Sequence, residues 1–396
     1  MATTQKTVGS GLAAPVRLWS GPEEPETESA RHSLSAPRRC EELAPHYDLT
    51  LSHPAVDMDS FRAFDAWLAK AAAARGLTCC LFHDDNVEEA TRRLRAGRLQ
   101  CGFHLDYYAL WHVPDDPYAR LAQAVHDRGG RTINVPERSR EFTNKAQAHV
   151  QLLEHGFGVP LSVRVPSGSM AEWVQTPSLS LRLDGSETLF IKPANGFGSR
   201  GIVCVEHCDR ERLLAAWENA RQFDAGDDYI VQRLVTWPRL SGDDGIERNA
   251  YWRVFYCLGE LIPFWWAKQE TGFAGPSYRR LTGAEIKRLR LQPLLAYAKD
   301  LAGLCGMNWF STEICLSDGD EPSRYQAPGP DGRMRPLVAI DYVNDQCDVD
   351  VQSRCPGSPP DALIRHVAER FAEAALVRKN TLPFGAAVFP SHNRAA

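Results

Sequence analysis

The sequence predicts an α/β (α+β) fold, and three stretches of the chain carry this prediction. Between residues 46 and 135, short apolar runs alternate with amphipathic stretches. Strands that alternate with helices at this spacing indicate a parallel sheet. Residues 189–205 place a glycine-rich turn between two β-rich stretches, and residues 252–343 add a hairpin, a helix and two further strands.

The first half of the chain contains an arm and one predicted domain. Residues 1–45 are rich in Pro, Ser, Glu and Ala without sustained periodicity, so we expect a flexible or loosely packed arm. A domain follows over residues 46–135. Its first helix, at 61–75, places Phe61, Phe64, Trp67 and Leu68 on one apolar stripe. The expected elements after that helix are a strand at 77–82, a helix at 87–96, a strand at 100–107, a helix at 117–128 and a strand at 131–135.

The second half begins with a helix at 143–155, which ends at Gly156 with Pro160 just beyond it. A hairpin is expected at 252–266 with its turn at Gly259. Residues 317–335 are mostly turn formers and charges, which predicts a long loop. The other expected elements are strands around Val163 and at 189–193, 201–205, 229–235, 307–316 and 337–343, and helices at 209–221, 283–304 and 361–379.

The composition is that of an ordinary globular protein. Of the 396 residues, 43% are hydrophobic and 24% charged, and the formal net charge is −5. General binders of nucleic acid or of anionic membranes usually carry a basic excess, so we expect neither partner. No run of about 18 apolar residues is present, which predicts no transmembrane helix. The chain start lacks a secretory pattern, and the eleven cysteines form no C-x-x-C pair or zinc-spaced cluster, so we expect reduced thiols in the cytoplasm.

The sharpest local signal is the stretch FIKPANGFGSRG at residues 190–201. A predicted strand ends at Lys192, and the six residues 196–201 then contain three glycines and a serine. Glycines permit the conformations that turn backbone N–H groups toward an anion, and a lysine just before them supplies a cation for a phosphate. The stretch is neither a Walker loop nor a Rossmann fingerprint. Taken alone, it is equally consistent with a structural turn.

The succession of motifs around this turn resembles the ATP-grasp superfamily over about residues 140–350. In order, the motifs are TNKAQAHVQLLEHGFGVP, FIKPANGFGSRG, YIVQRLV, YWRVFYCLGELIPFWWAKQE, FSTEI and VAIDYVND. The resemblance implies an ATP-grasp fold that binds ATP and Mg²⁺. It also implies a preceding α/β (pre-ATP-grasp) domain at 46–135, a small lobe at 136–235, and a large lobe with the metal site at 236–396.

The resemblance assigns roles to nucleotide-binding residues. Lys145 and Lys192 match lysines that reach the ATP phosphates. Arg233 stands where the family often has an acidic residue, and Asp243, Asp244 and Glu247 are open candidates for the ribose contact. The flap over the phosphates would contain Gly196, Phe197, Gly198, Ser199 and Gly201. The segment that links the lobes and reads the adenine edge through its backbone would be Gln232, Arg233, Leu234 and Val235.

Glu313 and Asp341 are the expected metal ligands. Magnesium ions that bridge nucleotide phosphates need hard oxygen ligands. The two acids lie on successive predicted strands, so antiparallel pairing would bring them together. The family places Asn two residues after the second acid, whereas Asn344 here follows Asp341 by three. Side chains alternate along a strand, so a bulge would be needed to aim Asn344 at the site, and Asp345 and Asp348 are the alternatives.

Arg253 and Lys268, on the two arms of the predicted hairpin, match cations that stabilise transferred phosphate. The leading hypothesis is a ligase that phosphorylates a carboxylate and joins it to an amine (or a thiol), releasing ADP and phosphate. An ATP-grasp kinase acting on a hydroxyl, or a non-catalytic nucleotide-binding module, are the alternatives. The sequence does not identify the small-molecule carboxylate and amine. It also leaves the oligomeric state open, although a homodimer is common for the fold.

Overall fold

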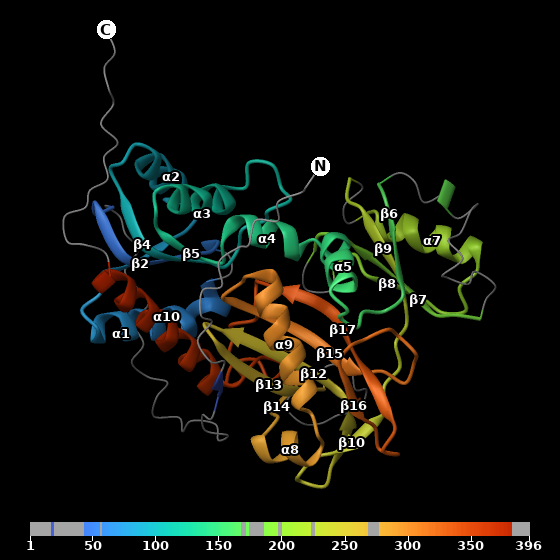
Figure 1. Cartoon of the computed structure of the whole chain (residues 1–396). Coiled ribbons are helices and arrows are strands. Elements are labelled where there is room, and N and C mark those ends of the chain that lie inside the picture. Colours follow the sequence, from blue (N-terminus) through green and yellow to red (C-terminus); the bar gives the residue numbers. More distant parts are fainter. Residues whose placement is uncertain are drawn as a thin grey trace, which may run out of the picture. The chain divides into compact units, whose positions relative to one another are not determined.

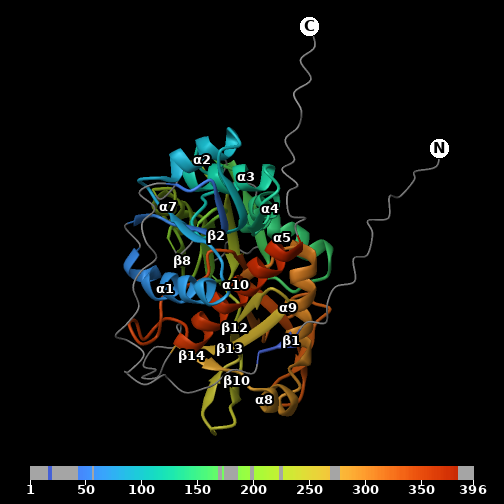
Figure 2. The ribbon, with the colours of Figure 1, turned by 90° about the vertical axis from the view of Figure 1, so that its left-hand side faces the viewer.

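The computed structural model describes residues 17–19, 43–55, 58–167, 172–173, 186–196, 200–222, 226–267 and 277–381. These residues form two compact units, which we describe separately (Figures 1 and 2). One unit contains Glu137–Asp348, Cys355–Pro359 and the described residues of Met1–Glu24. The other contains Val349–Arg354 and the described parts of Pro25–Pro136 and Pro360–Ala396. The predicted partition into an arm, a preceding domain and two lobes stays a prediction.

The second of these units is built on a four-stranded parallel sheet, as its alternating pattern predicts. The strand order is β3 (Cys79–Phe82), β2 (His46–Ser52), β4 (Gln100–Asp106) and β5 (Arg131–Ile133). Helices cover both faces, which explains why β2 is buried almost throughout. Figure 1 shows α2 (Val87–Arg95) and α3 (Pro117–Asp127) on one side of the sheet, and α1 (Met58–Ala74) and α10 (Asp361–Thr381) on the other.

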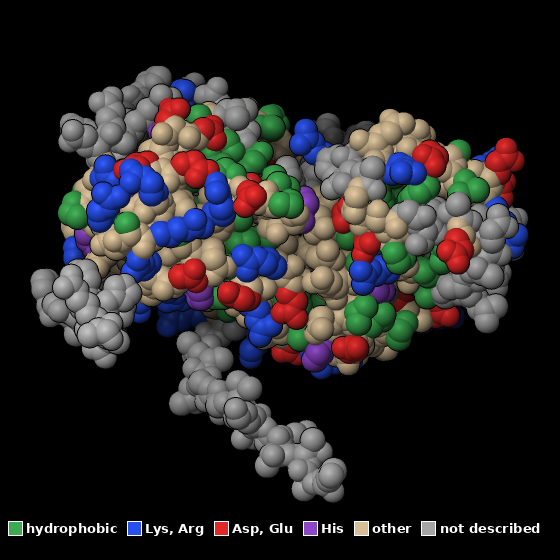
Figure 3. Space-filling model, turned by 90° about the horizontal axis from the view of Figure 1, so that it is seen from above, with side chains coloured by type: hydrophobic (Ala, Val, Ile, Leu, Met, Phe, Trp, Pro, Cys, Tyr) green, Lys and Arg blue, Asp and Glu red, His purple; other side chains and the backbone are tan. Residues whose placement is uncertain are grey.

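Basic side chains are numerous over this unit in the view of Figure 3. Helix α2 has Glu88 and Glu89 in its first turn and arginines in its last, an order that complements the helix dipole. Glu89 pairs with Arg92 and Arg93, and Glu88 pairs with Arg120 of α3. Ion pairs and the helix dipole therefore favour the charged side chains of α2. Among the described helices, none combines the length and the apolar composition that spanning a membrane requires.

In the first unit, a small antiparallel sheet carries the glycine-rich turn. Its order is β6 (Ser162–Val165), β9 (Tyr229–Arg233), β7 (Leu189–Pro193) and β8 (Val203–Val205). Helix α7 (Arg210–Ala220) packs on it through Leu213 and Trp217. Asp209 begins that helix, because its side chain accepts a hydrogen bond of 2.9 Å from the Arg212 N–H. These elements agree with the expected strands and helix of residues 163–235.

The larger sheet of the same unit has the order β1 (Arg17–Leu18), β13 (Glu260–Trp266), β12 (Tyr251–Cys257), β15 (Trp309–Leu316), β17 (Met334–Asn344) and β16 (Gln326–Pro328). Strand β14 (Tyr278–Arg280) also pairs with β13. Helices α8 (Gly283–Arg288) and α9 (Gln292–Cys305) pack on one face, where Trp252 and Trp265 lie in the main core. Because side chains alternate along a strand, Tyr251, Arg253 and Trp266 lie on the opposite face. A separate hairpin joins β10 (Arg239–Ser241) to β11 (Glu247–Asn249).

Strands β1, β2, β10, β11 and β14 were not expected from the sequence, and three further elements also differ from the predictions. The single helix predicted at 283–304 is wrong, because Arg290 adopts a left-handed φ of 53° and the chain starts again as α9 with Pro293 in its first turn. Helix α4 (Pro136–Thr143) precedes α5 (Lys145–Glu154) and was not expected. The predicted loop at 317–335 contains β16, which pairs with β17.

The described piece of the N-terminal arm is packed rather than loose. Strand β1 lies at the edge of the large sheet, parallel to β13 (Figure 2). Trp19 is only 8% exposed. Arg280 donates a hydrogen bond of 2.7 Å to the Trp19 carbonyl and places its guanidinium 5.0 Å from the indole ring. A strand of two residues forms few backbone hydrogen bonds. The contacts of Trp19 with Arg280 therefore help to hold β1 in place.

Candidate active site

A cavity of about 460 Å³ lies between the small and the large sheet of the first unit. Its lining brings together side chains that are far apart in the sequence, from α5, β7, β8, β9, β15 and β17. The predicted residues that line it are Lys145, Lys192, Gly196, Gln232, Arg233, Leu234, Val235, Glu313 and Asp341. One cavity thus contains the two predicted phosphate lysines, the predicted lobe-linking segment and both predicted metal acids.

Lys192 projects from β7 into the cavity. Its Nζ donates a hydrogen bond of 2.5 Å to Gln232 Oε1 on the neighbouring strand β9, and lies 3.4 Å from the Ile340 carbonyl. Burial lowers the pKa of Lys192 to about 8, and the nearby Lys145 acts in the same direction, whereas Asp341 and Glu313 oppose the shift. The Lys192 ammonium is therefore held at the cavity wall by neutral acceptors, the Gln232 amide and the Ile340 carbonyl.

Lys145 opens helix α5 and contacts the glycine-rich turn directly. Its Nζ donates to the Gly196 carbonyl at 2.6 Å, and its backbone N–H donates to the Ala194 carbonyl at 2.7 Å. Asn144 caps the helix by accepting from the Gln147 N–H at 3.0 Å, and its amide donates to Asn195 at 3.2 Å. Helix start and turn are thereby fixed to each other.

The structure describes both ends of the glycine-rich turn, at Asn195 and at Gly201. Gly201 has a φ of +69°, a region that side chains other than glycine rarely adopt. Asn195 is held by Asp227, which accepts from its backbone N–H at 2.7 Å and from its side-chain amide at 2.9 Å. Phe197, Gly198 and Ser199 lie outside the described residues, so their predicted role as a flap stays a prediction.

The segment from Gln232 to Val235 leads away from β9 along the cavity. The Arg233 N–H donates to the Leu161 carbonyl at 2.9 Å and the Leu234 N–H donates to the Thr188 carbonyl at 3.0 Å. These two donors are therefore already used within the protein. The Arg233 guanidinium lies 3.5 Å from Glu321, so this arginine is paired where the family often has an acid.

Glu313 and Asp341 are directly opposite each other on the antiparallel strands β15 and β17. The next pair in the register is Ser311 with Asn344. From the Glu313–Asp341 pair to this one, β15 advances by two residues and β17 by three. This irregularity is the bulge that the spacing of Asp341 and Asn344 required. Asn344 Oδ1 accepts a hydrogen bond of 3.1 Å from the Gln346 N–H, and its role as a metal ligand stays a prediction.

The Glu313 carboxylate is largely buried at the cavity wall. Burial raises its pKa to about 7, and Asp341 adds to the rise, while Arg253, the Tyr251 hydroxyl and Lys192 oppose it. Among the described residues, no group of three or more His, Cys, Asp or Glu side chains could hold a metal ion alone. Mg²⁺ commonly uses one or two carboxylates together with phosphates and water, so the Glu313–Asp341 pair fits a magnesium–nucleotide complex.

Arg253 lies opposite Glu313 on the neighbouring strand β12 and is not part of the cavity wall. It is 7% exposed. Its Nη1 donates to the Tyr278 hydroxyl at 2.9 Å, its Nε donates to Ser311 Oγ at 3.2 Å, and its guanidinium lies 4.6 Å from the centre of the Trp266 ring. Nη1 is 4.0 Å from Glu313 Oε1. Lys268, the other predicted catalytic cation, lies outside the described residues.

Sequence reasoning missed Trp237 and Tyr251 of the cavity wall, whereas Trp266 could be assigned from the sequence either to a substrate pocket or to the core. Trp237, Tyr251 and Trp266 form one aromatic part of the wall, with ring centres 4.9 Å apart for Trp237–Tyr251 and 5.9 Å apart for Tyr251–Trp266. Strand alternation was the available signal for Tyr251, because it lies two residues before Arg253 and therefore on the same face. Arg200 also lines the cavity.

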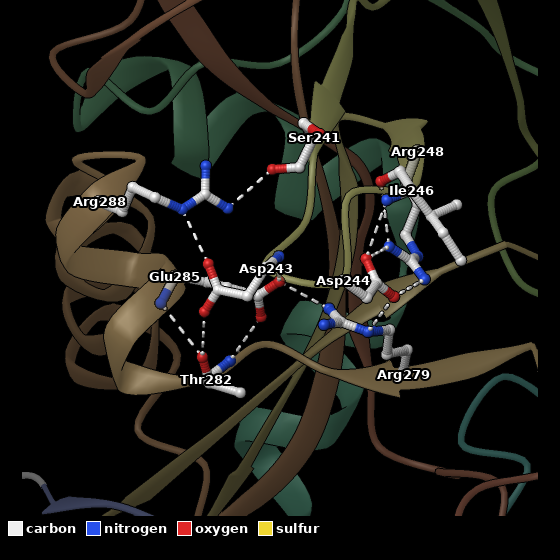
Figure 4. Close-up of polar contacts among 9 residues, drawn as sticks. All are labelled: Ser241, Asp243, Asp244, Ile246, Arg248, Arg279, Thr282, Glu285 and Arg288. Carbon is white, nitrogen blue, oxygen red and sulfur yellow. Dashed lines mark hydrogen bonds and ion pairs between the residues drawn. The ribbon is translucent and has the colours of Figure 1, made fainter.

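None of the three open ribose candidates lines the cavity, and two of them form ion pairs elsewhere. Asp244 accepts hydrogen bonds from both terminal nitrogens of Arg248 at 2.8 and 2.6 Å, and lies 3.2 Å from Arg279 (Figure 4). Asp243 pairs with Arg288 at 2.8 Å. Neither of them, nor Glu247, lines the cavity. This network instead fixes the β10–β11 hairpin to α8 and β14.

Comparison with solved structures shows which fold this is. The chain is similar to the D-alanine–D-alanine ligase of Bacillus anthracis, solved with ATP, at a TM-score of 0.53 and 11% identity over 85% of this chain and 99% of that one. A RimK-domain ATP-grasp protein from Sphaerobacter thermophilus matches at 0.52 and 16% identity over 82% and 98%. The VanG D-Ala:D-Ser ligase from Enterococcus faecalis matches at 0.51 and 13% identity over 85% and 99%.

No family model and no curated protein matches the sequence. The structural similarities show that this chain has the α/β architecture of the ATP-grasp fold. The prediction of that fold from the order of motifs is confirmed.

Proposed function

We propose that the protein is an ATP-dependent ligase that activates a carboxylate as an acyl phosphate and joins it to an amine, releasing ADP and phosphate. The observation that carries the proposal is the meeting of Lys145, Lys192, Glu313 and Asp341 around one cavity. The solved structures of similar fold include ligases, among them one crystallised with ATP. That likeness agrees with the proposal but does not identify the substrates.

The electrostatics of the cavity suit a polyanion accompanied by metal ions. Lys145, Lys192, Arg200 and Arg233 contribute positive charge, and the two acids contribute negative charge. A volume of about 460 Å³ lies in the range of small-molecule sites. The cations would hold the phosphates, and the two acids at one end of the wall would receive the metal that accompanies them.

Mg²⁺ would be held by Glu313 and Asp341, with Asn344 as the proposed third ligand. When bound, it would neutralise charge on the phosphoryl group. Lys192 would bind phosphate oxygens and Lys145 would fix the glycine-rich turn, so that both act by position and charge. We propose that Arg253 and Lys268 supply further positive charge for the transferred phosphoryl group. Arg253 lies next to Glu313, which places its charge close to the acids.

The setting of the reaction is also a proposal. The cysteines that the structure describes carry free thiols, which agrees with a reducing compartment such as the cytoplasm. Small-molecule carboxylates and amines are the proposed substrates, and a homodimer is the proposed assembly.

Trapping the acyl phosphate tests the reaction type. The full chain is incubated with MgATP, a panel of amino acids and hydroxylamine as a general amine. A ligase yields an acyl hydroxamate and phosphate in equal amounts, and a carboxylate labelled with ¹⁸O passes one label to the phosphate. The Glu313→Gln/Asp341→Asn variant is the control and should yield neither product. Transfer of the γ-phosphoryl group to a substrate without phosphate release would identify a kinase, and ADP binding without either reaction would identify a binding module.

A further inference from the structure

The site face of the large sheet carries a row of polar side chains that continues past Glu313. Arg253 of β12 lies opposite Glu313 of β15 on one side and opposite Phe264 of β13 on the other. Tyr278 of β14 is opposite Trp266 of β13. Tyr251 is two residues from Arg253 on the same strand and shares its face. Tyr251, Arg253 and Tyr278 are thus neighbours of Glu313 through the sheet rather than through the sequence.

Tyr251 holds one oxygen of Glu313. Its hydroxyl donates a hydrogen bond of 2.6 Å to Glu313 Oε2, and the residue is only 2% exposed. The ring is fixed between Trp237 and Trp266. The donor therefore has a defined position.

Arg253 faces the other oxygen of Glu313, and Tyr278 holds Arg253. Arg253 Nη1 is 4.0 Å from Glu313 Oε1 and donates at 2.9 Å to the Tyr278 hydroxyl. The Tyr278 and Trp266 rings are stacked, with centres 6.0 Å apart and 20° between their planes. The guanidinium lies against Trp266, which favours this placement further.

Strand β14 is itself anchored from the opposite face. Arg279, which follows Tyr278, donates at 2.7 Å to Glu285 Oε1, and Glu285 is fully buried (Figure 4). Glu285 also accepts from the Asp243 N–H at 2.9 Å and forms a capping box with Thr282 at the start of α8. A strand of three residues is thus fixed on both faces, which restricts the position of Tyr278.

We propose that Tyr251 and Tyr278 are positioning residues that orient the Glu313 carboxylate for a divalent metal–nucleotide complex, Tyr251 by a direct hydrogen bond and Tyr278 through Arg253. The inference rests on the proposed function, because it takes Glu313 as a metal ligand. Carboxylates that bind metals are commonly oriented by hydrogen bonds from the residues around them. Both oxygens of Glu313 have a fixed neighbour, so rotation of the carboxylate is opposed on either side.

Mn²⁺ binding tests the inference without any catalytic reaction. The full chain is titrated with Mn²⁺ in the presence of saturating ADP, and bound metal is followed by electron paramagnetic resonance. ADP affinity is measured separately without metal. Tyr251→Phe should weaken Mn²⁺ binding by about 10-fold or more, as for other changes around metal ligands. Tyr278→Phe should weaken it less, because its effect passes through Arg253. Metal-free ADP affinity should stay the same in both variants.

Tyr297→Phe is the matched control. Tyr297 is fully buried, and its hydroxyl donates at 2.8 Å to the Gly158 carbonyl in the main core, away from the site face. Loss of the Tyr297 hydroxyl should lower the melting temperature about as much as the two site variants do. It should leave Mn²⁺ binding unchanged. The inference is overturned if both site variants bind Mn²⁺ as tightly as wild type, or if Tyr297→Phe weakens Mn²⁺ binding as much as they do. Either result leaves the proposed function standing. If the wild-type chain binds neither ADP nor Mn²⁺, the proposed function fails and the inference fails with it.

Discussion

Lys192 Nζ lies 2.5 Å from Gln232 Oε1, so the cation at the centre of the cavity wall is held by a neutral amide. The acids Asp341 and Glu313 affect its pKa through space, but neither forms a direct ion pair with it. A half-buried cation without a bonded anion has charge available for an anionic ligand. This relationship supports the proposal that a phosphate group binds at this position.

Removing the Lys192 cation should therefore weaken nucleotide binding strongly. A charge-assisted hydrogen bond contributes about 1.5–3 kcal/mol, which corresponds to about a 10- to 100-fold loss of affinity. Lys192→Met keeps the length of the side chain, and MgADP affinity by calorimetry gives the measurement. Lys287→Met, on the exposed surface of α8, is the control and should bind like wild type. An unchanged affinity in Lys192→Met would show that the nucleotide does not use this lysine.

Binding of MgADP should depend on pH on both sides of neutrality. The pKa of Lys192 is lowered to about 8, so the cation is lost as pH rises above that value. The pKa of Glu313 is raised to about 7, so its carboxylate becomes protonated and stops binding metal as pH falls below that value. Affinity should thus be highest between about pH 7 and 8 and fall on either side.

Calorimetry from pH 6 to pH 9.5 checks both limbs separately. Lys192→Met should remove the alkaline decrease, and Glu313→Gln should remove the acidic one. A flat profile in the wild-type chain would contradict the assignment of both groups to the site.

Removing the buried Glu285 carboxylate from its ion pair with Arg279 should destabilise the protein. Glu285 is fully buried and accepts from Arg279, the Asp243 N–H and the Thr282 N–H. Glu285→Ala leaves Arg279 without this partner and should lower the free energy of unfolding by about 3 kcal/mol. Glu141→Ala removes the surface pair with Arg138 and should cost at most about 1 kcal/mol. Equal losses in urea denaturation would show that burial adds nothing here.

Acid should destabilise the unit that contains the parallel sheet. His104 is fully buried on β4, and its Nδ1 lies 2.9 Å from Thr50 Oγ1. Burial lowers its pKa from 6.5 to about 3, so the folded chain keeps it neutral while the unfolded chain binds a proton. Its contribution is fully present above about pH 6.5 and decreases by up to about 1.4 kcal/mol per pH unit below it.

Melting temperatures between pH 7.5 and pH 4.5 measure this loss. His104→Gln should give a smaller decrease across this range than the wild-type chain, even if its stability at pH 7.5 is lower. His112→Gln, an exposed position, should keep the wild-type slope. The prediction fails if both variants follow the wild-type slope.

Local patterns predicted much of the fold. The elements of residues 77–135 appear within a few residues of the expected bounds, because strand and helix periods and their flanking glycines and prolines act over short distances. The helix predicted at 283–304 failed for the opposite reason. Its apolar period continues through Arg290, and the break there depends on how α8 and α9 pack on the sheet.

Single residues of the candidate site could be predicted from the sequence, but which side chains face the cavity could not. Lys192 and Lys145 follow from the glycine-rich turn and the order of motifs. Trp265 and Trp266 were indistinguishable as core or cavity residues, because adjacent strand residues face opposite sides and only the packing of α8 and α9 selects which side is core.

Sequence patterns alone were enough to predict most of the strands and helices, the ATP-grasp fold, and the acids and lysines proposed to bind the nucleotide. Tertiary structure decided which of these charges share a cavity. Glu313 and Asp341 remain at its wall, whereas Asp243 and Asp244 are paired with arginines of α8, β11 and β14. The physical reason is that strand register and the pairing of buried charges depend on residues far apart in the chain, which no local pattern specifies.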